Sequence, residues 1–237
     1  MIDMHSHILP NMDDGCKDID ETLAVIKTMI KNGIHTICAT PHYYREDESI
    51  DEFLLRRQQR AEELKSALRQ ANIHDVRIIL GAETKFFPGM SNKALYKLCY
   101  ESSRYMLVEM PFRKWERDDL HELYRISATQ NITPVLAHVE RYTRFGNKVS
   151  RLTELNYPIQ LNAEAVTMFK YKRKSMYLLN RRSGLVLGSD CHDRLIRAPN
   201  LHKAESVIEK RFGKSKLAEI ERTENIVLNL SGLNRKV

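Results

Sequence analysis

Residues 1–7 read MIDMHSH, and this stretch places two histidines, His5 and His7, at the end of the short run that opens the chain. In an extended strand, side chains two positions apart point to the same face. Both imidazoles can therefore reach one point in space, and imidazole is the commonest metal-ligating side chain. Histidine pairs also occur at surfaces and caps, so the metal interpretation depends on whether the pattern recurs.

Short apolar runs recur along the chain. Together with residues 1–5, we predict strands at residues 35–39, 76–81, 105–108, 133–137, 157–161 and 185–188. Helical patterns occur at residues 19–31, 50–70, 91–98, 118–130, 176–182, 201–212 and 217–221. Gly33 is expected to end the first helix and Ser91 to cap the third. Residues 225–230 fit either a helix or a strand, and the basic tail after Gly232 is expected to fray.

This alternation of strands and helices indicates an α/β protein with parallel strands. Seven short strands that are apolar on both faces fit a closed or nearly closed barrel better than an open sheet. In a β/α barrel, the loops at the C-terminal ends of the strands form the active site. Residues that can bind a metal lie at or just past these ends: His5, His42, Glu83, Glu109, His138, Asp190 and His192.

With His7 and Asp14 the candidates number nine, and all of them offer nitrogen or oxygen ligands. One ion needs about four to six ligands, so the set implies two or three ions with a bridging carboxylate. Imidazole and carboxylate together suit Mn²⁺, Fe²⁺ or catalytic Zn²⁺, and clustered divalent ions are used for hydrolysis. We expect structural or surface positions for the histidines outside the pattern: His35, His74, His121 and His202.

The composition limits the classes of function. The 237 residues, 42% of them hydrophobic, can bury one sizeable core, so a single domain over residues 1–237 is expected. Lys and Arg exceed Asp and Glu by 38 to 31, which suits an anionic substrate or partner. No aromatic-interleaved basic motif predicts nucleic acid binding. The densest basic cluster, KYKRK at residues 170–174, is interpreted as a solvated loop or helix face.

Cysteine usage and hydropathy predict a cytoplasmic protein. The cysteines are scattered and form no CxxC pair, so they are interpreted as reduced thiols: Cys16, Cys38, Cys99 and Cys191. No apolar run reaches the length of about 18 residues that a membrane span needs. The N-terminal stretch carries acids where a signal peptide needs a basic start.

Seven short motifs along the chain together resemble one family: the HxH opening, MDDG, TPH, GAE, VEMPF, VLAHVERY and GSDCH. The chain resembles the polymerase-and-histidinol-phosphatase (PHP) superfamily over nearly its whole length. It is most similar to the bacterial tyrosine-phosphatase branch, which is encoded with capsule and exopolysaccharide genes. The resemblance implies a distorted (β/α)₇ TIM-like barrel with three metal ions, often manganese. It also implies removal of phosphate from the C-terminal tyrosine cluster of a bacterial autophosphorylating tyrosine kinase.

The resemblance also implies roles for individual residues. One ion would be held by His5, His7, Glu83 and Asp190. Glu83 would bridge to a second ion, which it would share with Glu109 and His138. The third ion would be held by Asp14, His42 and His192. Two arginines, Arg141 and Arg197, match family residues that grip the phosphate, a task that suits the paired hydrogen bonds of a guanidinium.

Three alternatives stay open at this point. Residues 191–197 fit the C-x₅-R spacing of cysteine-dependent tyrosine phosphatases, with Cys191 as nucleophile and Arg197 as phosphate ligand. A histidinol-phosphate or other small phosphomonoester phosphatase could use the same barrel, although this short chain spares few residues for extra recognition loops. A binding or regulatory protein with an inactive barrel is the third alternative, and the intact ligand positions argue against it.

Overall fold

All seven expected strands form in the computed structural model, which describes residues 1–230. They are β1 (Ile2–Ser6), β2 (Thr36–Ala39), β4 (Arg77–Leu80), β6 (Tyr105–Glu109), β7 (Thr133–Leu136), β8 (Ile159–Asn162) and β9 (Leu185–Gly188). Two further short strands, β3 (His42–Tyr43) and β5 (Glu83–Lys85), were not predicted. They continue β2 and β4 after a break, and the break after β2 contains Pro41, which has no N–H to donate.

The strands close into a distorted barrel. Parallel pairing gives two sheets, β1-β2-β4 and β3-β5-β6-β7-β8-β9. Backbone hydrogen bonds from Gly81 to Ala39 and from Glu83 to Pro41 carry the pairing across the two breaks. A parallel bridge between Ser6 and Cys191 joins β9 to β1 and closes the ring. The expectation of a seven-stranded β/α barrel is therefore confirmed, with two of its seven strands interrupted.

Glycine permits the closure between β1 and β9. A Cβ built on Gly188 would lie 2.5 Å from the Cβ of His5, far closer than van der Waals contact. A larger residue at this position would push β9 away from the strand that carries His5. The side chain is thus absent where two candidate site segments must approach each other.

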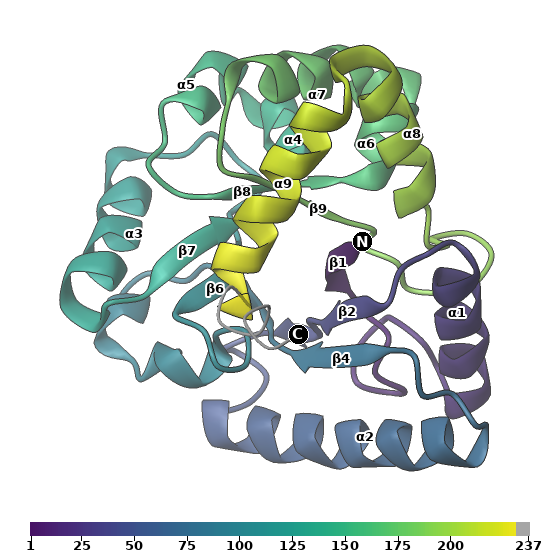
Figure 1. Cartoon of the computed structure of the whole chain (residues 1–237). Helices are drawn as coiled ribbons and strands as arrows, with labels where there is room; N and C mark the ends of the chain where they lie inside the picture. The colour runs from purple at the N-terminus through teal and green to yellow at the C-terminus, as the bar shows by residue number, and fades with distance from the viewer. Residues whose placement is uncertain (231–237) are drawn as a thin grey trace.

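Helices surround the barrel (Figure 1). The longer ones are α1 (Ile19–Lys31), α2 (Ile50–Gln70), α3 (Arg117–Gln130), α7 (Phe169–Arg181), α8 (Leu201–Phe212) and α9 (Lys214–Val227). Short helices α4 (Val139–Tyr142), α5 (Val149–Thr153) and α6 (Ala163–Thr167) follow the ends of β7 and β8. No helix in residues 1–230 is both long and apolar enough to cross a membrane.

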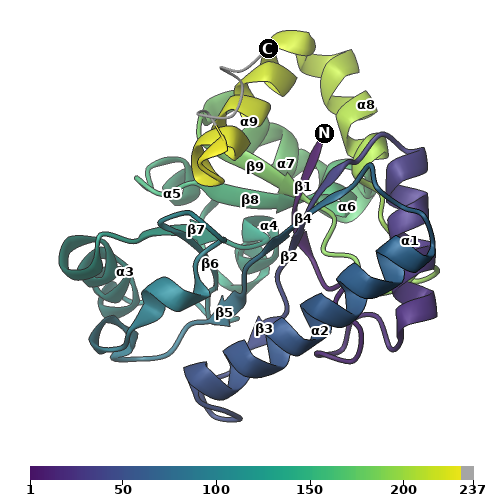
Figure 2. The ribbon, with the colours of Figure 1, turned by 60° about the horizontal axis from the view of Figure 1, so that its bottom comes forward.

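Helix α9 lies across the N-terminal ends of the strands. Its last residue, Val227, and the next residue, Leu228, join the apolar interior of the barrel, which includes Met4, Leu107 and Val186. Figure 2 shows α9 and the chain's N-terminus on one side of the strands, and β3 and β5 on the opposite side. The C-terminal ends of the strands are therefore left free of α9.

Two local predictions around Ser91 need correction. The helix expected at residues 91–98 is two 3₁₀ turns, Met90–Asn92 and Leu95–Leu98, and Ser91 lies inside the first turn instead of capping a helix. Helix α3 causes this difference: Ser91 donates its N–H to Glu122 Oε1 at 2.7 Å, and its carbonyl accepts from Gln130 Nε2 at 2.6 Å. These tertiary hydrogen bonds replace those of a local helix.

Two of the last three long helices, α7 and α9, are longer than expected. Helix α7 begins at Phe169 instead of residue 176, and α9 runs from Lys214 to Val227. The ambiguous residues 225–230 are thus helical as far as Val227, where the helix ends.

Gly33 follows α1 with a φ of 80°, as its predicted role at the helix end requires. The tail after Gly232 lies outside the described residues.

Candidate metal centre

The structure brings all nine candidate residues to the C-terminal edge of the barrel. His5 and His7 lie at the end of β1, and His42 and Glu83 begin β3 and β5. The others end β6 or occupy loops that follow strands: Asp14, Glu109, His138, Asp190 and His192. Seven of the nine are buried, and only Asp14 and His42 are more exposed.

Two of these residues have strained backbones. His138 and Asp190 each lie two positions past the end of a strand, β7 and β9, and their φ angles are 31° and 52°. Such conformations cost about 1–3 kcal/mol for a non-glycine residue and are concentrated at functional sites. In this barrel they turn two buried side chains toward the same cluster as the residues of β1.

The first group of side chains surrounds Glu83 Oε2. His5 Nε2 lies 3.1 Å and His7 Nε2 3.2 Å from this oxygen, and the two nitrogens are 3.1 Å apart. Asp190 Oδ1 is 3.7 Å from His5 Nε2 and 3.5 Å from His7 Nε2. Two nitrogens and two carboxylate oxygens thus converge on a single small volume.

Hydrogen bonds behind the two imidazoles determine which nitrogens face this volume. His5 Nδ1 lies 3.1 Å from Gln160 Oε1, and that oxygen also accepts the backbone N–H of His138 at 2.7 Å. His7 Nδ1 lies 2.7 Å from Asp13 Oδ2. Since both partners are acceptors, both Nδ1 atoms carry the hydrogen, and neutral imidazoles present lone pairs at Nε2. Three lone-pair atoms at about 3 Å require a proton or a metal cation among them.

Glu83 joins this group to a second one. Its Oε1 lies 2.7 Å from His138 Nε2, and that nitrogen is 3.5 Å from Glu109 Oε1. The two carboxylate oxygens of Glu83 therefore face different neighbours, as a bridging ligand must. His42 Nδ1 is 3.2 Å from Glu83 Oε2, so His42 also lies beside this group.

A third group lies nearer the surface. His192 Nε2 is 3.2 Å and His42 Nε2 3.6 Å from Asp14 Oδ1. Ligand atoms of His7, Asp14, His42 and His192 lie within 4.8 Å of one another. The same holds for His5, His7 and Asp190, and for His42, Glu83 and Glu109. His7 and His42 each belong to two groups, so the three groups form one continuous centre.

The charges of the buried groups depend on one another. Burial opposes ionisation of Glu83, but the nearby His5 and hydrogen bonds from imidazoles hold the pKa of this carboxyl well below its usual value. Burial also disfavours the charged form of His138, yet hydrogen bonds to Glu109 and Glu83 raise its pKa to about 9. Burial lowers the pKa of His192 to about 4, so its imidazole is neutral at pH 7. The centre thus combines carboxylates that attract a cation with imidazoles that can bind one.

Two arginines flank the centre and share one carboxylate. Arg197 donates from NH2 to Asp190 Oδ1 at 2.8 Å, and Arg141 donates to Asp190 Oδ2. The turn before Arg197 is held by Asp193, whose carboxylate accepts the backbone N–H groups of Leu195, Ile196 and Arg197. Both guanidinium groups are partly exposed, so they retain donors that face solvent.

An open cavity of about 320 Å³ connects the centre to the surface. Its lining combines acidic and imidazole groups with cations and two aromatic rings: His42, Tyr44, Glu83, Lys85, Glu109, Phe112, Arg141, Asp190 and Arg197. Phe112 stacks on His138 with ring centroids 5.9 Å apart and planes at 14°. Tyr44 stacks on His42 at 5.0 Å and 20°. The cavity thus has a charged floor and aromatic sides.

Several contributors to the site were not predicted, among them Tyr44 and Lys85 of the cavity lining. Asp13 and Gln160 orient imidazoles, Asn162 Nδ2 donates to Asp190 Oδ2 at 2.8 Å, and Phe112 lines the cavity. The signal for Gln160 and Asn162 was available, because they are polar residues two apart in an otherwise apolar strand. Asp13 adjoins Asp14, and the sequence does not tell which carboxylate faces the histidine.

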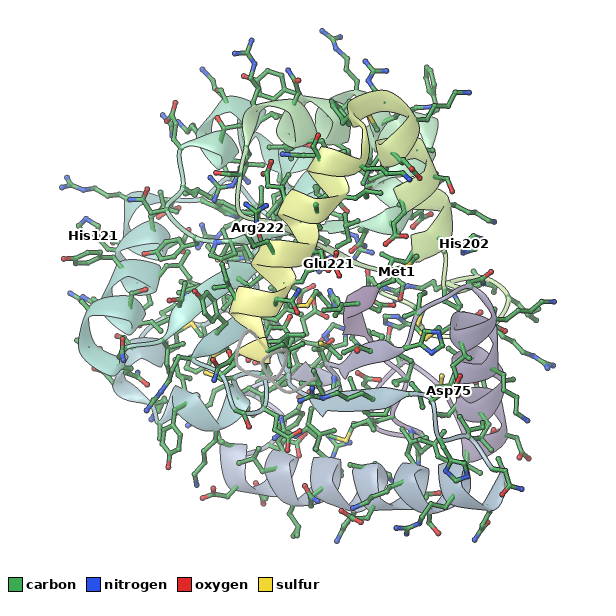
Figure 3. The ribbon with its side chains drawn as sticks, in the orientation of Figure 1. Met1, Asp75, His121, His202, Glu221 and Arg222 are labelled. Carbon is green, nitrogen blue, oxygen red and sulfur yellow. The ribbon has the colours of Figure 1, made fainter. Side chains whose placement is uncertain are left out.

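The structure argues against the cysteine mechanism. Cys191 is fully buried, and burial raises the pKa of its thiol well above the usual value. The loop N–H groups that would cradle a phosphate donate instead to Asp193. The four histidines outside the pattern lie apart from the centre, and Figure 3 shows His121 and His202 on the outer helices α3 and α8.

Imidazoles and carboxylates gathered at the C-terminal edge of a distorted (β/α)₇ barrel place the protein among PHP-type barrels. The chain belongs to the capsular polysaccharide synthesis family CpsB/CapC, whose family model matches residues 1–228. It is 30% identical over 236 residues to the tyrosine-protein phosphatase CpsB of Streptococcus pneumoniae, covering 93% of this chain and 94% of that protein. Tyrosine-protein phosphatase YwqE of Bacillus subtilis is 29% identical, over 90% of this chain and 85% of that protein.

Solved structures agree with this assignment. Crystal structures described as YwqE from Bacillus subtilis and CpsB from Streptococcus pneumoniae, metal-dependent tyrosine phosphatases, include one that matches with a TM-score of 0.85 and 25% identity. That match covers 97% of this chain and 95% of the other. Histidinol phosphate phosphatase from Lactococcus lactis matches with a TM-score of 0.55 and 16% identity, over 88% and 92% of the two chains, which shows a shared fold.

Proposed function

We propose that this protein is a metal-dependent protein-tyrosine phosphatase. The convergence of His5 Nε2, His7 Nε2 and Glu83 Oε2 within 3.1–3.2 Å is the observation that carries the proposal. Their hydrogen-bonded tautomers suit a cation at that point, and two arginines flank it. The relatives CpsB and YwqE, which are tyrosine-protein phosphatases, support the same conclusion.

The donor set fits divalent metal ions. His42 Nδ1 and His192 Nε2 are buried nitrogens that make no hydrogen bond among residues 1–230, although each lies 3.2 Å from a carboxylate oxygen. Such nitrogens beside carboxylates are what a metal site needs. We propose up to three ions, Mn²⁺ above all, with Fe²⁺ or Zn²⁺ as alternatives. The ligands would be His5, His7, Asp14, His42, Glu83, Glu109, His138, Asp190 and His192. Bound ions would activate water and neutralise phosphoryl charge.

The arginines would hold the phosphoryl group. Arg141 and Arg197 line the cavity beside the carboxylates, so their remaining N–H donors can bind phosphoryl oxygens. In the transition state of phosphoryl transfer, charge spreads over the equatorial oxygens. Donors already fixed by Asp190 stabilise that charge without reorganising during the reaction.

Aromatic cavity walls favour an aryl phosphate. Phe112 is 44% exposed although it stacks on His138, so one face of its ring is available to a substrate. Tyr44 presents a second ring beside His42. A tyrosine side chain can stack between or along such rings, with a gain of about 0.5–1.5 kcal/mol per aromatic pair. These walls therefore suit a phosphate ester that carries an aromatic ring, as phosphotyrosine does.

The proposed protein substrate is the phosphotyrosine-bearing C-terminal tail of a bacterial tyrosine kinase. Capsular polysaccharide synthesis, the process named for the family, supports a role in regulating capsule or exopolysaccharide production. The net positive charge of the chain suits such an anionic segment. This substrate would place the protein in the cytoplasm.

Activity measurements on two substrates test the proposal. Purified protein is assayed on a phosphotyrosine peptide and on histidinol phosphate, before and after EDTA, and again after Mn²⁺ is added. We expect hydrolysis of the peptide that is lost with EDTA and restored by Mn²⁺. Preference for histidinol phosphate would contradict the substrate, and full activity of protein shown by elemental analysis to lack metal would contradict the mechanism.

A further inference from the structure

A broad groove of about 930 Å³ runs along the outside of helix α7. Side chains of α7 line it at near-helical spacing from Phe169 to Asn180, and the end of α8 supplies Arg211 and Phe212. None of the lining residues is acidic. This groove is separate from the metal centre and has no role in the proposed chemistry.

The basic side chains of the groove have no carboxylate partner among the described residues. Lys170, Lys172, Arg173 and Arg211 form no ion pair among the described residues 1–230. The first turn of α7 contains no acid, and its N-cap residue, Met168, makes no side-chain hydrogen bond to the helix. Cations at a helix N-terminus oppose the macrodipole and cost stability, by about 0.3–1 kcal/mol each. Residues 170–174 thus form a solvated helix face, as predicted. Their positive charge lowers the stability of the helix that carries them.

Exposed aromatic rings accompany these cations. Phe169 is 97% exposed and Tyr177 is 43% exposed, and both line the groove. Exposed rings beside unpaired cations are typical of surfaces that bind a partner. A helix of this length extends about 20 Å, which an extended peptide spans with about six residues.

Helix α7, which lines the groove, contacts a segment next to the proposed active site. Lys174 of α7 donates to Thr143 Oγ1 at 2.6 Å, and Arg144 donates to the Tyr171 hydroxyl at 3.4 Å. Thr143 and Arg144 follow directly after α4, the short helix that carries Arg141. Figure 1 shows α4 and α7 close together on the same side of the barrel, and they are in contact. The helices that carry the groove and Arg141 are therefore neighbours, as the binding of one extended chain at both places requires.

We propose that this groove binds an acidic segment that flanks the phosphotyrosine of the protein substrate. The proposal rests on the proposed phosphatase function for its substrate, and on charge complementarity for its partner. Carboxylates spaced along an extended segment would pair with Lys170, Lys172 and Arg173, and an apolar residue would cover Phe169. The groove would then select protein substrates by their flanks, while the cavity selects the phosphorylated residue.

A binding measurement that needs no catalysis tests the groove. The probe is a fluorescent peptide of about twelve residues with glutamates on one side of a phenylalanine, which replaces the phosphotyrosine. We expect binding at low salt that weakens by about tenfold or more in Lys170→Glu/Lys172→Glu/Arg173→Glu. Acids at the start of α7 favour the helix, so this variant should fold. The matched control Lys27→Glu/Lys31→Glu/Lys203→Glu makes the same charge change on exposed residues of α1 and α8 and should bind as wild type.

Kinetics on metal-loaded protein provide the second readout. We expect the triple variant to raise KM about tenfold for a phosphotyrosine peptide with an acidic flank, and to leave a flankless aryl phosphate, p-nitrophenyl phosphate, within twofold. Equal binding of the acidic probe by wild type and variant would overturn the proposal, even if the enzyme is active. Equal losses in the control variant, or equally tight binding of an oligothymidylate of the same charge, would also overturn it. An inactive wild type that still binds the probe through these side chains would contradict the phosphatase function alone.

Discussion

His5 and Gln160 are joined by a hydrogen bond of 3.1 Å between imidazole Nδ1 and the amide oxygen, although 155 positions separate them in the chain. The same oxygen accepts the backbone N–H of His138, which orients the amide unambiguously. Gln160 therefore fixes the tautomer of His5 and the backbone beside His138 at once. Partners of this kind behind metal-binding histidines are worth about 10–100-fold in metal affinity.

Replacing Gln160 tests whether it positions the centre. We expect Gln160→Leu to weaken Mn²⁺ binding by about 10–100-fold, because His5 loses the acceptor that holds its Nδ1 hydrogen. Titration calorimetry on folded protein measures the change. Gln130→Leu is the matched control, since Gln130 also bonds to backbone groups but lies at the Ser91 turn. Equal Mn²⁺ affinity in wild type and Gln160→Leu would show that the amide has no such role.

Substitution of Cys191 distinguishes a metal-dependent mechanism from one that uses a cysteine thiolate. Its thiol is buried and its pKa is raised by that burial, so it is unsuited to act as a thiolate. We expect Cys191→Ser to keep most of the activity, while Asp190→Ala and His192→Ala each lose nearly all of it. A buried hydroxyl can cost about 1–3 kcal/mol of stability, so folding is checked by circular dichroism and Cys191→Ala is compared. If both cysteine variants were folded, metallated and inactive, the thiolate mechanism would be restored.

The sequence predicts the barrel well because each of the seven longer strands leaves a strong local signal. The runs at residues 105–108 and 185–188 are apolar, short and directly followed by Glu109 or Ser189-Asp190, so both the strand and its end are visible. β3 and β5 leave no such signal, because they contain two and three residues after a break. The Ser91 cap is wrong for a different reason: its backbone bonds to Glu122 and Gln130, which no local pattern reveals.

The residues that surround the candidate ligands are harder to predict than the ligands. A histidine just after a strand indicates a possible metal ligand by its residue type and its position. Gln160, by contrast, lies within a strand and reads only as a polar interruption of an apolar run. Its role becomes visible only in the folded barrel, where its side chain reaches His5 of β1. β1 is not a neighbour of β8 in the sheet, because β9 lies between them. Phe112 likewise looks like an ordinary exposed apolar residue until its ring is seen on His138. Long-range geometry supplies this information.

Glu224 makes stability depend on pH. It lies in α9 and accepts the backbone N–H of Leu187 at 3.1 Å. Burial raises its pKa to about 8; Glu205 and Asp3 add to this rise, while the Leu187 hydrogen bond and the N-terminal amino group oppose it. The folded protein thus binds this proton more tightly than the unfolded chain. The resulting stability is fully present below about pH 4.5 and is lost as pH rises toward 8.

Glu224→Gln removes this dependence and keeps the acceptor oxygen. Between pH 5.5 and 8.5, we expect the free energy of unfolding to fall less in the variant than in wild type, by on the order of 2 kcal/mol. Chemical denaturation at several pH values measures it. Glu221→Gln, on the exposed side of the same helix (Figure 3), should follow wild type. Parallel curves for wild type and Glu224→Gln would mean that Glu224 has an ordinary pKa in the folded protein.

Substitutions of Arg141 and Arg197 test whether these two residues bind the phosphoryl group of the substrate. Both bond to Asp190 and line the cavity, so each can stabilise charge that develops on a phosphoryl group. We expect Arg197→Ala and Arg141→Ala to lower kcat/KM for a phosphotyrosine peptide by about 10²-fold or more, on the scale of one lost oxyanion donor. The lysine variants should recover only part of this loss, because a point charge cannot make the paired contact.

Metal content must be measured in the same arginine variants, because each removes a hydrogen bond from a candidate ligand, Asp190. Elemental analysis and circular dichroism should give values near wild type. Arg194→Ala is the matched control: Arg194 is exposed in the same loop and does not line the cavity, so its kinetics should not change. A loss below threefold in both alanine variants, with metals retained, would mean that other groups hold the phosphate. A large loss of kcat/KM together with a loss of bound metal would instead show that the arginines hold Asp190 in place. The loss of activity would then be explained by the missing metal and not by weaker binding of the phosphoryl group.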